Sequence, residues 1–552
     1  MNVLFVHPLC RADEAPHHLP FGIGILANIG DMLGHRVAVL DMNAFRHVHS
    51  AESIRQEITD PDIKDGWDVI CIGGLHSTYK EIKRILPILR NQSKNAIIMA
   101  GGSYITHLPF ETMKLNPEID CGAIGEGEET FREMLQAVKN NNWKDVRGIV
   151  YREKDEIILN DPRPQIQDLD TIPYPAYHLI PLEVYFQYSP LMLSPESMVS
   201  RKRMSFVWER GCPRMCRFCS HAGMSRLDMI QLYGKDKITK MEKAQAKPEI
   251  DDRGTQMMAR WPSPKYAVEN VFLARWKYGI DFASILDENM LSNRKWTEEF
   301  CQLYMERGLH EVVSWGSLGD APSVAVNPDL VRVMKEAACK YISFGFESAS
   351  DRTLANDIGK GQTQKHEQIA VDTMVKNGLT PVATFMLGNP TETVDDLLET
   401  VMFWIKNRIE VDPFICTPYP GSAYFYKYRR KIEEQYDYRL EYVKDKPGLV
   451  NPEQEKEWRL AALDRFLNDL DDATVLTATI SEVYHYGDLL AFRNLMHMKD
   501  MGRILKFAHY RNFPHQDKWK QWCPVCKAQE ELKLPEQLKT IATPQVRQGI
   551  AF

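Results

Sequence analysis

The segment that decides the fold is Trp208–His221, which reads Trp-Glu-Arg-Gly-Cys-Pro-Arg-Met-Cys-Arg-Phe-Cys-Ser-His. Its three cysteines, Cys212, Cys216 and Cys219, are separated first by three residues and then by two. The run Ser205–Glu209 directly before them is typical of a short β-strand. The spacing therefore predicts three thiolates on one tight loop at the end of a strand.

Three thiolates on one loop indicate an iron–sulfur cluster with an open iron. A [4Fe–4S] cluster needs four ligands, so three cysteines leave one iron for an external ligand. That iron can chelate the amino and carboxylate groups of S-adenosylmethionine (SAM) and pass an electron to its sulfonium. The alternative is a zinc loop with His221 as fourth ligand. A closed zinc site, however, does not require the strand ends that follow.

The cysteine loop opens a series of alternating strands and helices from about residue 200. The expected strands are Ser205–Glu209, Phe282–Asp287, Val312–Gly316, Tyr341–Glu347, Thr380–Leu387 and Phe414–Pro418. Six such units predict an α/β fold, a partial (β/α)6 barrel with its site at the carboxyl ends of the strands.

The cysteine loop and the strand ends together resemble the radical SAM superfamily over residues 200–425. The resemblance implies that Asp287 and Glu288, after the second strand, bind the methionine ammonium of SAM. It assigns Glu347 to the ribose hydroxyls and Gly388 to the vicinity of adenine. Taken alone, each acidic residue could equally cap a helix.

The first 145 residues form a separate alternating series. The expected strands are Val3–Val6, Arg36–Asp41, Val69–Gly74, Asn95–Gly102 and Cys121–Ile124. Continuous apolar strands that alternate with helices favour a doubly wound parallel sheet, whose ligands bind beyond the carboxyl ends of the strands. A complete Gly-x-Gly-x-x-Gly motif is absent after the first strand, which argues against NAD.

This N-terminal unit resembles the cobalamin-binding domain of the cobalamin-dependent radical SAM branch, which includes methyltransferases and the anaerobic magnesium-protoporphyrin cyclase. The resemblance implies cobalamin contacts from strand-end residues, namely Gly73, Gly74, His76, Ser77, Gly101, Gly102, Gly125, Glu126 and Gly127. The motif Asp-x-His-x-x-Gly is absent, so cobalamin is expected to bind without that histidine ligand. His76 could approach the lower face of cobalt, contact the corrin periphery, or bind nothing.

Four units are expected along the chain, and the third contains an insertion. They are a Rossmann-like cobalamin domain at 1–145, a linker with a β-hairpin at 146–200, the barrel at 201–425 with an insertion at 222–262, and a mostly helical cap or substrate domain at 426–552. The insertion could be a substrate lid or an idle surface segment. Tyr419 and Tyr424 are weak candidates for lining a substrate cavity, since aromatic residues there also pack.

A second Cys-x-x-Cys pair, Cys523 and Cys526, lies near the C-terminus and follows His509 and His515. It could bind zinc, act as a redox pair or be inert, and the four residues do not show a regular ligand spacing.

Composition limits the classes of protein to which this chain could belong. A formal net charge of −7 argues against a nucleic-acid partner, and no apolar run is long enough to span a bilayer. The eleven cysteines suit a reducing, oxygen-poor cytoplasm better than a disulfide scaffold.

The resemblance implies a methyltransferase that moves methyl from methylcobalamin to an unactivated carbon after SAM cleavage. It also implies an electron donor such as flavodoxin or ferredoxin. The first expectation is an amino-acid side chain, for example glutamine, in a peptide or protein. The alternatives are a small-molecule natural-product methyltransferase and an oxidative cyclase. A methylthiotransferase would need three more clustered cysteines, and a cobalamin sensor would leave the SAM-directed strand ends unexplained.

Overall fold

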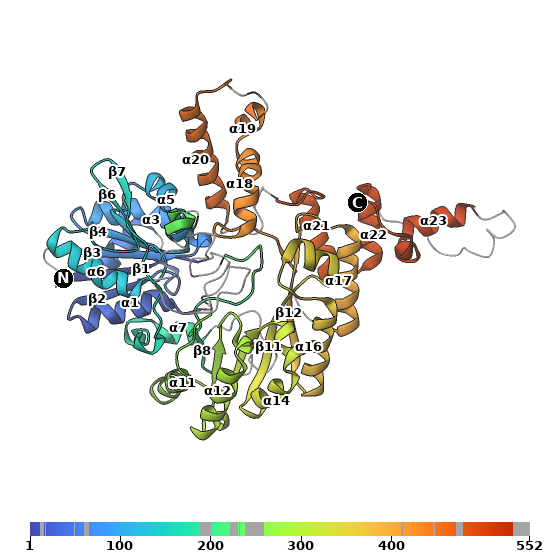
Figure 1. The fold of residues 1–552 in the computed structure, drawn as a ribbon, viewed down its shortest axis with the longest axis horizontal. Coiled ribbons are helices and arrows are strands. Elements are labelled where there is room, and N and C mark those ends of the chain that lie inside the picture. The colour runs from blue at the N-terminus through green and yellow to red at the C-terminus, as the bar shows by residue number, and fades with distance from the viewer. Residues whose placement is uncertain are drawn as a thin grey trace.

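The structure is a computed structural model. It describes residues 1–10, 16, 18–48, 50–59, 66–187, 200–220, 230, 232–237, 259–409, 413–444, 446, 448–470 and 479–533. Two β-sheets, each packed against helices, lie side by side, and further helices extend from them toward the C-terminal end (Figure 1).

The N-terminal sheet has seven strands in the order β2-β1-β3-β4-β5-β6-β7. They are β1 (Asn2–His7), β2 (Arg36–Asp41), β3 (Val69–Gly74), β4 (Ile97–Gly102), β5 (Cys121–Ala123), β6 (Ile149–Glu153) and β7 (Glu156–Leu159). The first five are parallel, whereas β6 and β7 join as an antiparallel hairpin. The hairpin expected in the linker therefore extends this sheet. The chain order reverses between β1 and β3, the position where such sheets bind ligands.

Helices cover both faces of this sheet because its strands are apolar on both sides. Leu4 and Val6 of β1 pack toward α2 (Ala51–Ile58) and α3 (Tyr79–Gln92). The alternate residues of β1, Val3 and Phe5, pack toward α1 (Phe21–Met32) and α6 (Glu128–Asn140). The predicted doubly wound arrangement is confirmed. Two short helices, α4 (Ser103–His107) and α5 (Pro109–Leu115), follow β4.

The second sheet has six parallel strands in sequential order and forms a half-barrel, as predicted. They are β8 (Arg203–Phe206), β9 (Phe282–Ile285), β10 (Ser314–Gly319), β11 (Cys339–Glu347), β12 (Thr380–Leu387) and β13 (Pro413–Ile415). Sequential parallel order brings all six carboxyl ends to one edge. The cysteine loop, which follows β8, therefore lies at the same edge as the ends of β9 to β12.

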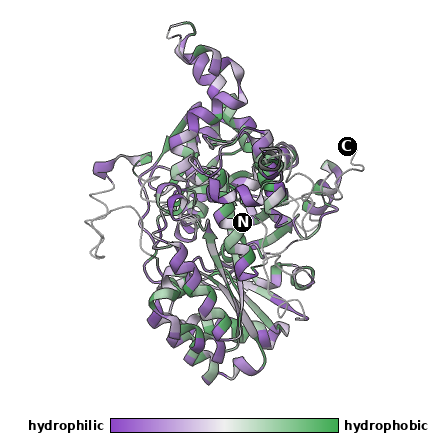
Figure 2. Cartoon of the chain, turned by 90° about the vertical axis from the view of Figure 1, so that its right-hand side faces the viewer, coloured by the Kyte–Doolittle hydropathy of each residue, from purple (hydrophilic) through white to green (hydrophobic). Residues whose placement is uncertain are grey.

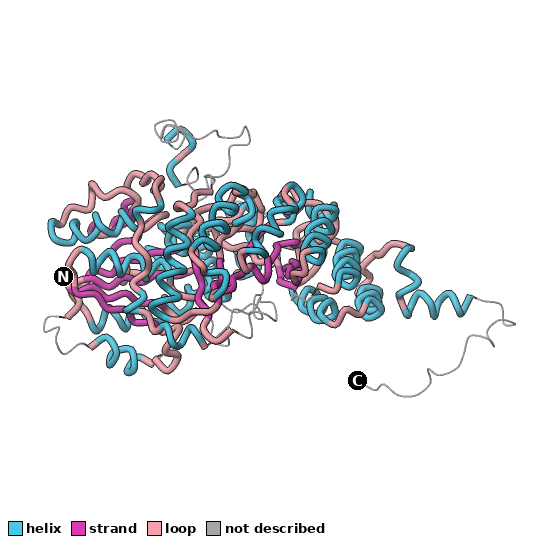
Figure 3. Tube along the Cα trace, turned by 90° about the horizontal axis from the view of Figure 1, so that it is seen from below, coloured by secondary structure: helices cyan, strands magenta, loops and turns pink. Residues whose placement is uncertain are grey.

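Long helices cover the outer face of the half-barrel (Figures 1 and 3). They are α11 (Pro264–Tyr278), α12 (Arg294–Glu306), α14 (Pro328–Glu336), α16 (Gln364–Lys376) and α17 (Val394–Asn407). In α11, the Ser263 hydroxyl accepts from Tyr266 N–H at the start, and Gly279 ends the helix with φ +77°. Such caps satisfy backbone groups that the helix leaves free. Short elements at the strand ends are α13 (Ala321–Val326), α15 (Asp351–Thr353) and the π-turn η6 (Leu354–Ile358).

The C-terminal helices divide between the two sheets. The helices α18 (Ala423–Tyr436), α19 (Tyr438–Val443) and α20 (Pro452–Asp469) form a projecting hairpin, and the base of α18 and α20 packs in the core cluster of β3 and α3. Hydrophilic residues run along much of this hairpin in Figure 2. By contrast, α21 (Tyr486–His497), α22 (Met501–Tyr510) and α23 (Pro524–Lys533) follow the half-barrel, where α21 contacts β13. None of the described helices combines the length and apolar character that a bilayer span requires.

Candidate functional site

The cysteine loop starts from a backbone turn that only glycine adopts readily. Gly211 has φ +84° immediately before Cys212. Within the loop, Cys219 N–H donates to Cys216 O over 3.1 Å, which closes a tight turn. Cys212 is buried, and Cys216 and Cys219 are half-buried. All three cysteines are placed at the strand-end edge, as the spacing predicts.

The loop is clamped between two other elements. Arg217 N–H donates to Ile358 O in the π-turn η6 (3.0 Å), and Arg217 O accepts from Tyr424 N–H at the start of α18 (3.0 Å). The Arg217 guanidinium also donates to the carbonyl oxygens of Ala355 and Asp357. The backbone of the cysteine loop is therefore held before any cofactor binds, which lowers the ordering cost of assembly.

The electrostatics of the thiols suit a cationic metal centre. Burial raises the pKa of Cys216 to about 11 and that of Cys219 well above its ordinary value, and the nearby thiols and Glu288 raise the pKa of Cys219 further. Thiolates are the species that bind iron. A metal cation at the loop would offset the free-energy cost of deprotonating these thiols. Three neighbouring thiols on one loop thus fit a cluster.

Asp287 has a structural partner at the site. Its Oδ1 accepts from the backbone N–H groups of Trp208 (2.6 Å) and Glu209 (2.9 Å), which fixes the chain between β8 and the cysteine loop. Burial raises the pKa of both Asp287 and Glu209. Glu288, its half-buried neighbour, contributes to the raised pKa of Cys212, after burial as the main cause.

An ion pair ties the cysteine loop to the end of β10. Arg214, between the first two cysteines, pairs with buried Asp320. The Asn289 side-chain amide donates to the same Asp320 carboxylate over 2.9 Å. Burial would raise the pKa of Asp320, but hydrogen bonds and charge from Arg214 hold that pKa below its usual value. Asp320 thus stays ionised and orients two loops.

Glu347 lies at the end of β11 in a strained backbone conformation. Its φ of +64° is unusual for a residue with a Cβ, and such outliers cluster at functional sites. Lys360 Nζ lies 3.5 Å from Glu347 Oε1 and donates to Gly345 O over 2.6 Å. Burial raises the pKa of Glu347, while Lys360 acts in the opposite direction. The Cys216 thiol also contributes to the raised pKa of Lys360, so these groups share one neighbourhood.

Gly388 forms the turn after β12. Its φ is +84°, and an added Cβ would lie 2.7 Å from Leu489 Cδ1 of α21. The Gly388 N–H donates to Glu392 Oε2 over 2.6 Å. The glycine is therefore required both by its backbone conformation and by a C-terminal helix that packs on it.

The carboxyl edge of the N-terminal sheet is rich in glycine for two different reasons. An added Cβ at Gly102, whose φ is +96°, would lie 2.2 Å from Gly74 O, so this pair permits the close approach of β3 and β4. An added Cβ at Gly101 would meet nothing within 4 Å, whereas at Gly73 it would make only ordinary contact. The open side of Gly101 fits the approach of a nucleotide tail.

His76 and His107 form a stacked pair at this edge, with ring centroids 5.1 Å apart. His76 Nδ1 lies 3.2 Å from the Ser103 hydroxyl, and His76 Nε2 lies 3.4 Å from His107 Nδ1. Burial holds the pKa of His76 well below its usual value, so the ring is neutral at neutral pH. Ser77 beside it is half-buried. His76 thus contacts other side chains, and its role toward cobalamin stays a prediction.

The histidine pair reaches the cysteine loop. His107 Nδ1 lies 3.5 Å from the hydroxyl of Ser220, the residue after Cys219. The same hydroxyl donates to Pro420 O over 2.6 Å. An added Cβ at Gly421 would lie 2.7 Å from the His107 ring. The edges of the two sheets therefore meet at this histidine.

The acidic run after β5 contacts arginines near the cysteine loop. Glu126 pairs with Arg260 and accepts from Ile166 N–H over 2.9 Å. Glu128 Oε1 lies 2.5 Å from Arg210 Nη2, two residues before Cys212. Carboxylates in this run thus connect the two domains. Gly125 has φ +82° and donates its N–H to Thr106 Oγ1, while Gly127 precedes α6.

The two tyrosine candidates differ. Tyr424 is buried and donates its hydroxyl to Asp357 O over 2.8 Å, which is a packing role. Tyr419 is half-buried, and its ring centroid lies 6.3 Å from that of His76. His221 and most of the 222–262 insertion lie outside the described residues.

Sequence reasoning missed several residues at this site, namely Ser103, His107, Glu128, Arg210, Arg214, Ser220, Asp320 and Lys360. The position of Arg210 and Arg214 beside the cysteines was a usable indication, because cationic side chains there need buried anionic partners. His107 has no comparable local indication, since it follows β4 and contacts His76 after β3 and Ser220 after β8. Lys360 lies 13 residues beyond Glu347 of its own strand β11, a separation that no local pattern marks.

Comparison with known families agrees with both halves of the site. Residues 12–135 match the B12 binding domain, and residues 207–403 match the radical SAM superfamily. The fold, the site and these two matches therefore define a radical SAM enzyme with a B12 binding domain. Such an enzyme uses SAM, a [4Fe–4S] cluster and cobalamin.

Individual proteins similar to this chain include methyltransferases and a cyclase. An uncharacterised methyltransferase of Pyrococcus horikoshii is 28% identical over 411 residues, covering 72% of this chain and 78% of the relative. The anaerobic magnesium-protoporphyrin IX monomethyl ester cyclase of Cereibacter sphaeroides is 24% identical over 445 residues, covering 78% and 64%. The solved structure of the radical SAM methyltransferase TsrM from Kitasatospora setae aligns with a TM-score of 0.58 at 13% identity, covering 79% and 78% of the chains, a likeness in fold.

Proposed function

We propose that this enzyme transfers a methyl group to an unactivated carbon. The observation that carries the proposal is the meeting of the two sheet edges, where His107 Nδ1 lies 3.5 Å from the Ser220 hydroxyl beside the cysteine loop. Radical transfer between two cofactors and a substrate needs all three in one cavity, because orientation supplies much of the rate. Similarity to a relative named as a methyltransferase supports the same reaction class.

The residues at the strand ends hold and orient the cofactors in this proposal. When bound, the cluster with SAM supplies a carbon-centred radical, and cobalamin supplies the methyl group. Cys212, Cys216 and Cys219 hold the cluster. Glu288, rather than the backbone-bound Asp287, is our first candidate for the methionine ammonium, because of its influence on the thiols.

The other cofactor contacts follow from the same edge. In this proposal Glu347, which is buried beside Lys360, binds the ribose hydroxyls, and Gly388 lies near the adenine. The open side of Gly101 receives the nucleotide tail of cobalamin. In this proposal Glu126 does not bind cobalamin. It links the two domains through its ion pair with Arg260.

We infer that the substrate is an amino-acid side chain, such as glutamine, within a peptide or protein. A hollow between α5, α18 and α20 supports this class, because both signs of charge line it and suit a polar extended chain. Its charged residues are Glu111, Lys114, Arg429, Glu433, Glu453, Lys456, Glu457 and Arg459. A flavodoxin or ferredoxin is the proposed electron donor in an oxygen-poor cytoplasm.

An oxidative cyclase is the second candidate, favoured by the similarity to the magnesium-protoporphyrin cyclase over 78% of this chain. The two reactions differ in the fate of the SAM methyl group. Transfer adds that group to the substrate, whereas cyclisation removes hydrogen and adds no carbon.

The test uses anaerobically reconstituted protein with reductant, cobalamin and SAM that carries a deuterated methyl group. We expect a candidate glutamine-containing peptide to gain one labelled methyl group, with release of 5′-deoxyadenosine. Cys216→Ala should abolish both, and Cys301→Ala, which changes a buried cysteine on α12, should abolish neither. Hydrogen loss without labelled methyl would favour the cyclase. If no candidate substrate led to release of 5′-deoxyadenosine, the enzyme proposal would be refuted.

A further inference from the structure

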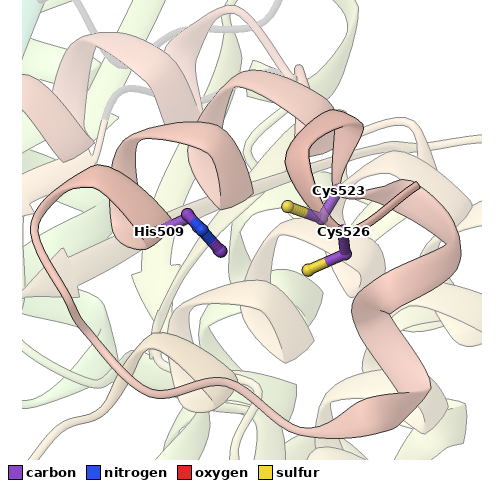
Figure 4. A group of neighbouring side chains, drawn as sticks. All are labelled: His509, Cys523 and Cys526. Carbon is purple, nitrogen blue, oxygen red and sulfur yellow. The ribbon is translucent and has the colours of Figure 1, made fainter. Parts of the chain in front are cut away.

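Three potential metal ligands gather at the C-terminal helices, apart from the cofactor edge. His509 lies near the end of α22, Cys523 directly precedes α23, and Cys526 lies in its first turn. One ligand atom from each of these three residues lies within 4.8 Å of the other two. Figure 4 shows the imidazole and both sulfur atoms facing a common space.

His515, on the loop between α22 and α23, is the candidate for a fourth ligand, and it lies outside the group of three whose ligand atoms are all within 4.8 Å of one another. Its Nε2 lies 3.6 Å from Cys526 Sγ, and its ring centroid lies 6.4 Å from that of His509. A tetrahedral zinc ion with ordinary Zn–S and Zn–N bonds places sulfur and nitrogen ligands about 3.6 Å apart. The His515–Cys526 separation already equals that value. The buried His515 Nδ1 has no hydrogen-bond partner among the described residues. The orientation of the ring is therefore not fixed by a hydrogen bond at Nδ1.

The backbone presents the two sulfur atoms together. Cys523 N–H donates to Lys520 O (3.1 Å), and Cys523 O accepts from Lys527 N–H (3.0 Å). This turn places both cysteines at the N-terminal end of α23, where the helix dipole and free backbone N–H groups favour thiolates. Cys523 is fully buried, and Cys526 is 8% exposed. Two buried thiols and two half-buried imidazoles together match the nitrogen and sulfur ligands that Zn²⁺ prefers.

The surrounding contacts indicate what such an ion would stabilise. The segment between the two histidines and the cysteines is attached to α17 by two polar contacts. Gln516 N–H donates to Asp395 Oδ1 (3.0 Å), and Lys518 Nζ lies 2.8 Å from Glu399 Oε1. The helix α23 extends away from the half-barrel in Figure 3, and its main contacts are with α22 and η7 (Asp517–Trp522). A metal ion would therefore supply much of its attachment.

We propose that His509, His515, Cys523 and Cys526 bind one structural zinc ion that fastens α23 and the preceding loop to α22. Four protein ligands close the coordination sphere, so the ion has no open position for catalysis. The site is distinct from the [4Fe–4S] loop, which lies at the carboxyl edge of β8. The chain thus carries a third metal besides iron and cobalt. Loss of zinc should loosen α23 and leave the cysteine loop unchanged.

Metal analysis of the full-length protein tests the proposal. After anaerobic purification and dialysis against EDTA, we expect about one zinc per chain. Cys523→Ser and His515→Ala should lose that zinc while keeping the iron and cobalt contents of wild type. Cys339→Ser, which changes a buried cysteine in β11, should keep all three metals. Equal zinc in wild type and Cys523→Ser, or no zinc in wild type, would overturn the proposal.

A measurement on wild type alone covers the case in which a variant fails to fold. X-ray absorption at the zinc edge should report two sulfur ligands near 2.3 Å and two nitrogen ligands at about 2.0–2.1 Å. Two other outcomes contradict the proposal. A mass lower by two hydrogens on the Cys523–Cys526 peptide would indicate a redox disulfide, and iron at this pair would indicate a second iron centre.

Discussion

At the scale of single residues, burial changes the protonation of Glu392, which accepts a hydrogen bond in the turn after β12. Its Oε2 accepts the N–H of Gly388 over 2.6 Å, and burial raises the pKa of Glu392 to about 8. The folded chain therefore keeps this proton up to about pH 8, whereas the ordinary pKa of the unfolded chain is 4.5. Between these values unfolding releases a proton, so stability from this group is present at low pH and is lost as pH rises.

We predict that Glu392→Gln flattens the fall in unfolding temperature between pH 5 and pH 8. Glutamine keeps a carbonyl acceptor for Gly388 and has no proton to lose, so the slope changes by at most about 1.4 kcal/mol per pH unit. Thermal unfolding by circular dichroism across this range measures the effect. Glu311→Gln, at an exposed position, is the control. Parallel pH profiles for wild type and Glu392→Gln would contradict the assignment.

His76 provides the second residue-scale prediction. Because both ring nitrogens face side chains, Ser103 and His107, we expect no bond from His76 to cobalt. His76→Ala should lower the cobalamin content of the protein and leave the iron content unchanged. The electron paramagnetic resonance spectrum of bound cob(II)alamin should lack nitrogen splitting from this histidine in both proteins. A splitting present in wild type and lost in His76→Ala, but kept in His497→Ala, would show that His76 is a ligand.

The residues of the site differ in how far sequence could predict them. Cys212, Cys216 and Cys219 are close in the chain, so their spacing alone indicates a shared metal. Asp287 lies just beyond a strand end, as its sequence position predicts. Its carboxylate, however, contacts the backbone of Trp208, a partner that depends on how β8 and β9 pair. No local pattern specifies such a contact between strands.

At the scale of elements, the pair of Glu128 on α6 and Arg210 beside the cysteine loop links the two domains. Glu128 is buried, and its Oε1 lies 2.5 Å from Arg210 Nη2. The Arg210 side chain is 28% exposed, so removing one partner costs less than the about 3–5 kcal/mol of a fully buried pair. The link also decides how firmly the cobalamin edge faces the cysteine loop.

We predict that Glu128→Ala lowers the amount of methylated product per 5′-deoxyadenosine, because the domains separate more readily while SAM cleavage continues. A double-mutant cycle with Arg210→Met should give a coupling free energy of about 1–3 kcal/mol in unfolding. The neighbouring pair Glu129 and Arg132, which is more exposed, should give about 0.2–1 kcal/mol. Additive effects of Glu128→Ala and Arg210→Met would exclude the link.

At the scale of the whole molecule, the C-terminal region serves both domains. The helix α20 docks on α3 through Asp464, which lies 2.5 Å from Lys83 Nζ and accepts from the Tyr79 hydroxyl over 3.0 Å. In contrast, α21 places Leu489 against Gly388 of the half-barrel. The chain after the barrel thus passes from one sheet to the other and holds them together.

We predict that Asp464→Ala increases local opening of the α18–α20 hairpin about fivefold. The Lys83 pair is partly exposed and contributes little by itself, so the expected loss is about 1 kcal/mol once the Tyr79 hydrogen bond is included. Limited proteolysis within the hairpin measures the opening. Lys456→Ala, at an exposed pair on α20, should leave the cleavage rate unchanged. Equal cleavage of wild type and Asp464→Ala would refute the docking role.

The sequence by itself determined the features that depend on nearby residues. Hydrophobic periodicity places the strands, so that β2, β3 and β12 begin and end where predicted, and the cysteine spacing identifies the metal loop. Tertiary structure alone decided which strand ends meet. It pairs Glu128 with Arg210, brings His107 to Ser220, and gathers His509 and Cys523 at one point. These contacts join segments whose separation in the chain carries no local pattern, because only the packing of whole elements fixes the distances between them.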